Sequence, residues 1–323
     1  MAHYSIFREE LAIAYPTYGN ALWEPDPGGQ YNAVEVGDVG FIRRGYFQRL
    51  FNVLHPKDHP SHRNPSFVPE DHQQLETIPD HIVKNEIRTG SRQNSLHFCS
   101  QYVTLESRGR GTSAAGPEDD SEVTFSCYGK QGALLSLPVP AQGEDTVAFG
   151  DFGKWMIKHI DAWFAFARGL GLGINRMEDI ILVTGRHLTK SWVNVAFTQR
   201  RRDSGVSFDV QVSNHGHVAL EQQYVHGGDL KLGPTGRDLP ENQCIFIRGF
   251  RVVRILGMWP RLRGQAGPAP DAGDHEPEFD THLELIGVPT DSNVKRSRLS
   301  LPNLSLIFRK VSGSPSRSVT IYR

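Results

Sequence analysis

The sequence predicts an α+β, mainly β fold, with a single globular domain of about eight to ten short strands and one prominent helix packed on the sheet. Three observations lead to this prediction. The 32 glycines and 20 prolines among 323 residues exceed their usual combined share of about 12 %, which favours many turns. Short apolar stretches alternate with polar residues and are bounded by turn formers. Only one segment, residues 151–169, carries a long helical pattern.

In residues 151–169, apolar and aromatic side chains recur every three or four positions, which places them on one helical face. The members of this face are Phe152, Trp155, Met156, His159, Ile160, Trp163, Phe166 and Ala167. Asp151 stands where a first-turn acid belongs, and Gly169 and Gly171 follow as stop signals. Residues 180–183 are apolar at every position, as in a strand buried on both faces. We expect this helix and strand to form the core.

The chain before the core helix begins with a short helical pattern over residues 1–14, followed by a loop over 18–29. Residues 34–42 alternate as a strand does, with a bulge or tight turn at Gly37-Asp38. Residues 46–54 are short and apolar, which fits either a strand or a helical turn.

Residues 55–80 are rich in proline and histidine and predict a surface loop, after which residues 95–106 predict a strand. Residues 108–121 are small and charged, as in a flexible connector. Residues 123–128 and 133–138 predict a β-hairpin with a four-residue turn.

Beyond the core helix, the pattern predicts strands at 191–197, 206–212 and 244–256, the last bent at Gly249. We therefore place the globular core in residues 1–258. Residues 259–323 are rich in proline, glycine and charge, and predict a partly disordered tail with one or two late strands.

Charge and cysteine content exclude several classes of protein. The 35 basic and 36 acidic residues give a net charge of -1, so nothing draws the whole chain to nucleic acid or to an anionic membrane. The three cysteines, Cys99, Cys127 and Cys244, are too sparse for a disulfide framework. The charged N-terminal segment and the lack of a long apolar run predict neither a signal peptide nor a transmembrane helix. We expect a soluble cytoplasmic protein.

Residues 184–191, TGRHLTKS, invite a comparison with a phosphate-binding loop because they follow a strand and end in Lys190-Ser191. Such a loop needs glycines where this chain has Thr184 and Thr189, since backbone N–H groups must approach the phosphates. The segment therefore predicts a polar turn, with Gly185 supplying a positive φ.

The candidate metal ligands are His55, His59 and His62, because imidazole is the commonest ligand for zinc and copper. Pro56 and Pro60 break any helix that would align them. The sequence therefore favours a solvated loop over a metal site, and no cofactor is expected.

No spacing typical of nucleophilic catalysis is present, neither G-x-S-x-G nor H-E-x-x-H nor C-x-x-C. Each cysteine lies in an apolar strand pattern and predicts a buried thiol. The basic groups at 200–202, at Arg248, Arg251 and Arg254, and at 295–298 favour a solvated surface, with anion contacts as the alternative.

Several stretches between about residues 18 and 256 resemble a family of uncharacterised proteins from mushroom-forming (basidiomycete) fungi. These stretches are residues 21–25, 36–42, 50–52, 163–166, 178–185, 191–192 and 240–244. The resemblance implies a fungal, intracellular protein, and it implies no activity and no functional residues.

The function that these observations favour is a non-enzymatic binding or interaction module, with a protein as its partner. The first alternative is an enzyme whose site forms only in the fold, with Asp38, His187 and Cys244 as its lining. A membrane-active, pore-forming-like β protein is the second alternative. The oligomeric state is open.

Overall fold

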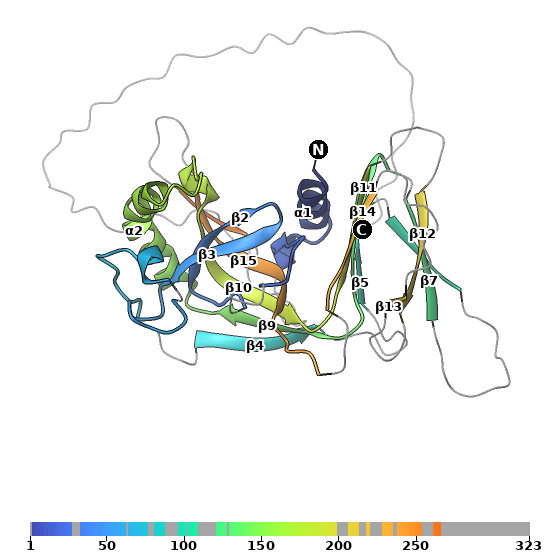
Figure 1. Cartoon of the computed structure of the whole chain (residues 1–323), viewed down its shortest axis with the longest axis horizontal. Helices are drawn as coiled ribbons and strands as arrows, with labels where there is room; N and C mark the ends of the chain where they lie inside the picture. The colour runs from blue at the N-terminus through green and yellow to red at the C-terminus, as the bar shows by residue number, and fades with distance from the viewer. Residues whose placement is uncertain are drawn as a thin grey trace, which may run out of the picture. The chain divides into compact units, whose positions relative to one another are not determined.

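The computed structural model describes residues 2–27, 33–62, 64–76, 81–87, 96–101, 103–108, 121–127, 129–198, 206–212, 218–219, 228–234, 238–253 and 261–265. All of them belong to one compact unit, Met1–Ala272. Within this part the protein is mainly β, with one eight-stranded and two four-stranded antiparallel sheets and two α-helices (Figure 1). The mainly β, α+β prediction is confirmed. No helix among these residues is long and apolar enough to cross a membrane.

The eight-stranded sheet has the central order β1-β15-β10-β2-β3, with β16 paired to β15, β9 to β10 and β4 to β9. Its strands are β1 (Asn20–Ala21), β2 (Asp38–Arg43), β3 (Tyr46–Asn52), β4 (Ile82–Ile87), β9 (Ala141–Thr146), β10 (Ile181–Thr189), β15 (Gln243–Val253) and β16 (Arg261–Gln265). Among the described strands, β3 is the end of the central order and pairs only with β2.

The two smaller sheets follow the orders β14-β11-β8-β5 and β13-β12-β7-β6. Their strands are β5 (Leu96–Cys99), β6 (Val103–Arg108), β7 (Ser121–Cys127), β8 (Gln131–Leu137), β11 (Val193–Thr198), β12 (Val206–Val212), β13 (Val218–Ala219) and β14 (Gly228–Leu232). The hairpin predicted from 123–128 and 133–138 is wrong, because β7 and β8 belong to different sheets. β8 is buried along nearly its whole length and lies between β5 and β11.

The described residues form sixteen strands, more than the eight to ten predicted. The strands that the pattern missed are short or polar. β1 has two residues, and β9 reads AQGEDT without an apolar run. Pairing with neighbouring strands, rather than intrinsic preference, makes such segments extended. β16 lies within the predicted tail and pairs with β15; the late strands predicted near 304–308 and 319–322 lie outside the described residues.

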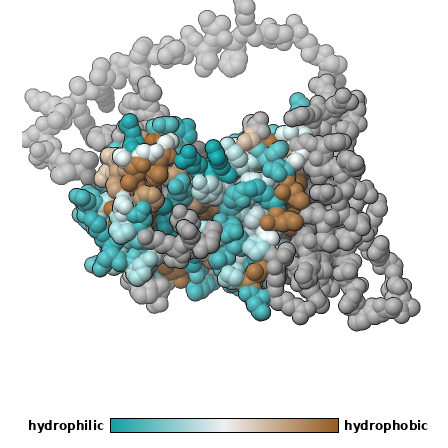
Figure 2. All heavy atoms as spheres, viewed as in Figure 1, coloured by the Kyte–Doolittle hydropathy of each residue, from teal (hydrophilic) through white to brown (hydrophobic). Residues whose placement is uncertain are grey.

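The core helix is confirmed as α2 (Phe149–Gly169), two residues longer at its start than the pattern indicated. Its buried face includes Phe152, Met156, Ile160 and Trp163, and it packs in one core cluster with residues of β2, β3, β10 and β15. Burial of this face stabilises the helix, since each large apolar side chain contributes about 1.5–3 kcal/mol. Beyond it, Leu170 and Leu172 are only half-buried, and Figure 2 shows hydrophobic residues gathered in the region of α2 on the face in view.

A second cluster forms around α1 (His3–Ala14), the short helix that residues 1–14 predict. Phe7 and Leu11 of α1 pack with Trp23, Phe98 and Phe246, and the Phe7 and Trp23 rings meet edge to face at 5.1 Å. α1 therefore joins β15 of the large sheet to β5, β8 and β11 of a small one.

Candidate functional site

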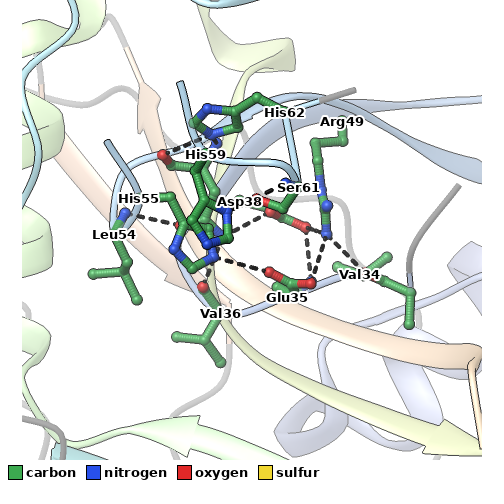
Figure 3. A network of polar contacts seen from close by, with 12 residues as sticks. Val34, Glu35, Val36, Asp38, Arg49, Leu54, His55, His59, Ser61 and His62 are labelled. Atoms are coloured by element: carbon green, nitrogen blue, oxygen red, sulfur yellow. Dashed lines mark hydrogen bonds and ion pairs between the residues drawn. The ribbon is translucent and has the colours of Figure 1, made fainter. Parts of the chain in front are cut away.

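A buried carboxylate lies at the start of β2. Gly37, with φ +89°, and the bond from the Asp38 N–H to the Glu35 carbonyl form the tight turn predicted at Gly37-Asp38. The Asp38 carboxylate accepts hydrogen bonds from Asn52 Nδ2 (2.8 Å) and the Glu35 N–H (2.7 Å), and pairs with Arg49 Nη2 at 2.6 Å (Figure 3). Burial raises the pKa of Asp38 to about 6, although Arg49 opposes the rise.

The prolines of the loop after β3 fold the histidines together instead of separating them. The His59 N–H bonds to the Pro56 carbonyl and the His62 N–H to the His59 carbonyl, which forms two successive turns. The His55 and His59 rings stack with centroids 4.0 Å apart, and the His62 ring lies 5.8 Å from that of His72. The structure thus brings the three candidate metal ligands together and adds His72.

Most of the ring nitrogens in this cluster bond to the protein. His62 Nε2 accepts from the Asn52 N–H at 3.0 Å, and its Nδ1 lies 3.3 Å from the Lys57 carbonyl. His55 Nε2 lies 3.2 Å from Glu35, and His59 Nδ1 lies 2.7 Å from Ser61 Oγ (Figure 3). These directions diverge, and no three His, Cys, Asp or Glu side chains of the described residues are arranged to hold a metal ion.

A second polar cluster lies where β9, β10 and β15 meet. Arg248 forms a two-pronged pair with Asp145, with Nε and Nη2 at 2.5 and 2.8 Å from its oxygens. Its Nη1 donates to His187 Nδ1 at 2.9 Å. Burial, with Arg248 beside it, lowers the pKa of His187 to about 2, so this imidazole is neutral.

Gly185 makes room for this cluster. A Cβ at residue 185 would overlap Asp145 Oδ1 and lie 2.7 Å from Arg248 Nε. The positive φ predicted for Gly185 is wrong, since this residue is not among the positive-φ glycines described, and β10 continues through Thr189 where a polar turn was predicted. A glycine is needed here for close approach, not for turning.

Of the three residues predicted to line an enzyme site, His187 and Cys244 lie close together, because the His187 backbone hydrogen-bonds to the Cys244 thiol, and the charge of Asp38 also acts on that thiol. Their main side-chain partners nevertheless differ. Asp38 is enclosed by Arg49 and Asn52, and His187 by Arg248 and the Tyr18 ring. Cys244 packs in an apolar cluster, and burial raises the pKa of its thiol to about 12. Burial also raises the pKa of Cys99, to about 11. Of the three thiols predicted to be buried, Cys244 is buried, Cys99 is only half-buried, and the side chain of Cys127 lies outside the described residues. With their raised pKa values, the Cys99 and Cys244 thiols are protonated and unreactive at neutral pH.

A groove runs along β3. It encloses a cavity of about 830 Å³ and is lined by the loop after Trp23, five residues of β3 and the histidine loop. The lining residues are Leu22, Glu24, Pro25, Asp26, Pro27, Val34, Arg44, Tyr46, Phe47, Gln48, Arg49, Leu50, Ser61, His62, Asn64 and Phe67. A second cavity, between α2 and the loop at His72, measures about 10 Å³ and matches a single water molecule.

Two polar groups of the groove have no partner among the described residues. The Gln48 Oε1 atom is buried without a hydrogen bond. Arg44, in the turn between β2 and β3, has φ +50° and is the one described non-glycine residue with positive φ. Sequence reasoning missed this groove, although the Arg44-Gly45 pair signals a two-residue hairpin turn at its rim.

Of the basic groups considered in the sequence, Arg248 is buried in the cluster described above, while 200–202, Arg254 and 295–298 lie outside the described residues. The chain matches no family model, and no curated protein matches it. Its function is therefore inferred from the geometry of the groove and of the two polar clusters.

Proposed function

We propose that this chain is a non-enzymatic binding module that holds its partner in the groove beside β3. One observation carries the proposal. The cavity, about 830 Å³, has the size of a ligand site, and it combines the aromatic Tyr46, Phe47 and Phe67 with the unpaired Gln48 Oε1. Apolar area supplies affinity in such a groove, and a few polar groups fix orientation.

The titratable groups argue for binding rather than catalysis. An active site brings together groups with strongly shifted pKa values inside one cavity. The groups with the largest shifts in the described part are Asp38, His97, Cys99, His187 and Cys244. None of these five is a lining residue of the groove. The cytoplasmic location and the relationship to the basidiomycete family remain predictions within this proposal.

A fragment screen tests the proposal. The full chain is exposed to a library of small aromatic and aliphatic fragments, and binding is read from melting temperature and from ligand-observed NMR. Gln48→Arg fills the groove without removing a hydrogen bond, and Gln142→Arg, at the exposed position of β9, is the matched control. We expect fragments that bind the wild type and Gln142→Arg, lose binding to Gln48→Arg, and are recovered chemically unchanged.

Two results would overturn the proposal. One is a screen in which no fragment depends on Gln48. The other is a fragment class that the wild type converts to a product while Gln48→Arg does not.

A further inference from the structure

The groove lies against the edge of β3, not against one of its faces. Residues 46–50 all line it, although successive side chains of a strand point to opposite faces. Five consecutive lining residues place the cavity beside the strand, where side chains of both faces flank the unpaired main chain. β3 is also the end of the central strand order.

The register shows which main-chain groups face the groove. Arg43 pairs with Tyr46 across the two-residue turn Arg44-Gly45, so Tyr46 and Gln48 exchange hydrogen bonds with β2. An independent observation agrees, since a Cβ at Gly40 of β2 would overlap the Gln48 carbonyl oxygen. The N–H and C=O groups of Phe47 and Arg49 therefore point outward. No described backbone group outside the sheet bonds to them.

Arg44 is the charged lining residue without a partner in the described part of the chain, because Asp26, like Glu24 and Arg49, has an interaction of its own. Glu24 pairs with Lys231, and Arg49 pairs with Asp38. Arg44 has neither an ion pair nor a hydrogen bond with a described residue, and it keeps a left-handed backbone that asparagine or glycine adopts at less cost. Strained residues of this kind are concentrated where a protein binds its ligand.

We propose that the groove takes an extended segment of a partner protein, which adds to β3 as a further strand and sets an acidic residue opposite Arg44. Main-chain bonds to Phe47 and Arg49 supply the pairing, as in other cases of strand addition. An apolar side chain of the segment packs against Phe47 and Phe67, which line the groove. A polar side chain bonds to the Gln48 amide once this amide turns toward the segment, since Gln48 Oε1 is buried in the free protein. This inference rests on the proposed function and names the class of partner.

Peptide selection followed by N-methylation tests it. Random dodecapeptides are selected on the full chain, and the tightest binder is resynthesised with one N-methyl group at each position in turn. In a paired strand only alternate N–H groups face the partner. We expect N-methylation at alternate central positions to weaken binding about tenfold, and at the positions between them much less.

Matched variants test the protein side. Phe47→Ala and Phe47→Pro remove the same aromatic ring, but only proline removes the N–H, which an edge strand tolerates on its outward side. Phe47→Pro should bind the peptide about tenfold more weakly than Phe47→Ala. Arg44→Gln should lower the affinity for peptides that carry the acidic residue about fivefold. The affinity for the same peptides with Asp→Asn or Glu→Gln should stay unchanged.

The outcomes separate the two proposals. If fragments bind in a way that depends on Gln48 but the selection gives no binding peptide, the proposed binding module is supported and strand addition is overturned. Selected peptides whose affinity does not depend on N-methylation at alternate positions would also overturn strand addition. This test uses the wild-type chain, so it does not require that Phe47→Pro folds. Concentration-dependent dimers that Phe47→Pro abolishes would replace the partner segment with a second copy of this chain.

Discussion

The closed cluster of Arg248, Asp145 and His187 and the open groove beside β3 belong to the same eight-stranded sheet, yet they treat polar groups in opposite ways. All three nitrogens of the Arg248 guanidinium have partners, and all three side chains are at most 4 % exposed. In the groove, Arg44 and Gln48 Oε1 have none among the described residues. Since an unmatched buried polar group costs free energy, the matched cluster serves the fold, and the buried, unmatched Gln48 Oε1 points to a ligand from outside, whereas Arg44 is exposed.

Breaking the closed cluster should have the largest effect. Asp145→Ala leaves the Arg248 charge buried without its carboxylate, and we expect a loss of about 4–5 kcal/mol in the free energy of unfolding. Denaturant titration measures it. The control is Asp179→Ala, which removes an exposed pair with Arg176 and should leave the midpoint unchanged. An equal effect of both changes would contradict the comparison.

Truncating the core helix should cost nearly as much. Trp163 is 5 % exposed and meets the Phe51 ring edge to face at 5.6 Å, which links α2 to β3 behind the groove. Trp163→Ala should lower the free energy of unfolding by about 3–5 kcal/mol, through lost burial and the cavity left behind. A loss near zero in the same titration would mean that this face of α2 contacts a partner instead.

Acid should weaken the fold through two neutral histidines, the buried His187 and the half-buried His97. His187 and His97 have pKa values of about 2 and about 4, below 6.5, so their contribution is complete above pH 6.5 and is lost as the pH falls. At pH 5 each histidine lowers the free energy of unfolding by about 2 kcal/mol. Asp38, with its pKa raised to about 6, increases it by about 1.4 kcal/mol. The expected net loss from pH 7 to pH 5 is about 2.5 kcal/mol.

Denaturant titrations at the two pH values check this expectation. His97→Gln should remove about 2 kcal/mol of the acid-induced loss, because the histidine no longer takes up a proton on unfolding. Stability that stays level between pH 7 and pH 5 would show that these imidazoles are protonated in the folded protein.

The smallest expected effect belongs to the open groove. Arg44→Asn relieves a left-handed arginine and should raise the free energy of unfolding by about 0.5–1 kcal/mol. If Arg44→Asn makes the protein more stable but lowers its affinity for the peptide, Arg44 serves recognition of the partner and not the fold. A loss of stability on this change would mean that Arg44 supports the fold instead.

The sequence predicted elements whose signal is local. α2 has a regular apolar period, and β10 begins with a run of buried aliphatic residues, so both were found within two residues of their starts. Pairing partners were not predictable, because β7 and β8 are close in sequence but belong to different sheets. Alternation tells which residues face inward, and it does not tell which strand lies alongside.

The polar sites were predictable only in part. The histidine loop was singled out by its composition, but the stacking of His55 on His59 follows from two successive turns that its prolines begin. The ion pair of Arg248 with Asp145 joins residues 103 positions apart, and no spacing rule reaches so far. The groove was missed because an edge strand becomes recognisable only when its neighbours are known.

The lack of space beside Gly185 makes the residues at positions 145, 185 and 248 depend on one another. A methyl group there is compatible only with the absence of the Asp145–Arg248 pair, so Gly185→Ala should be harmful alone and milder once both charges are replaced by small apolar residues. Divergent copies of this gene are then expected to exchange all three positions or none. Joint replacement at these three positions would therefore help to recognise distant relatives whose overall sequence similarity is low.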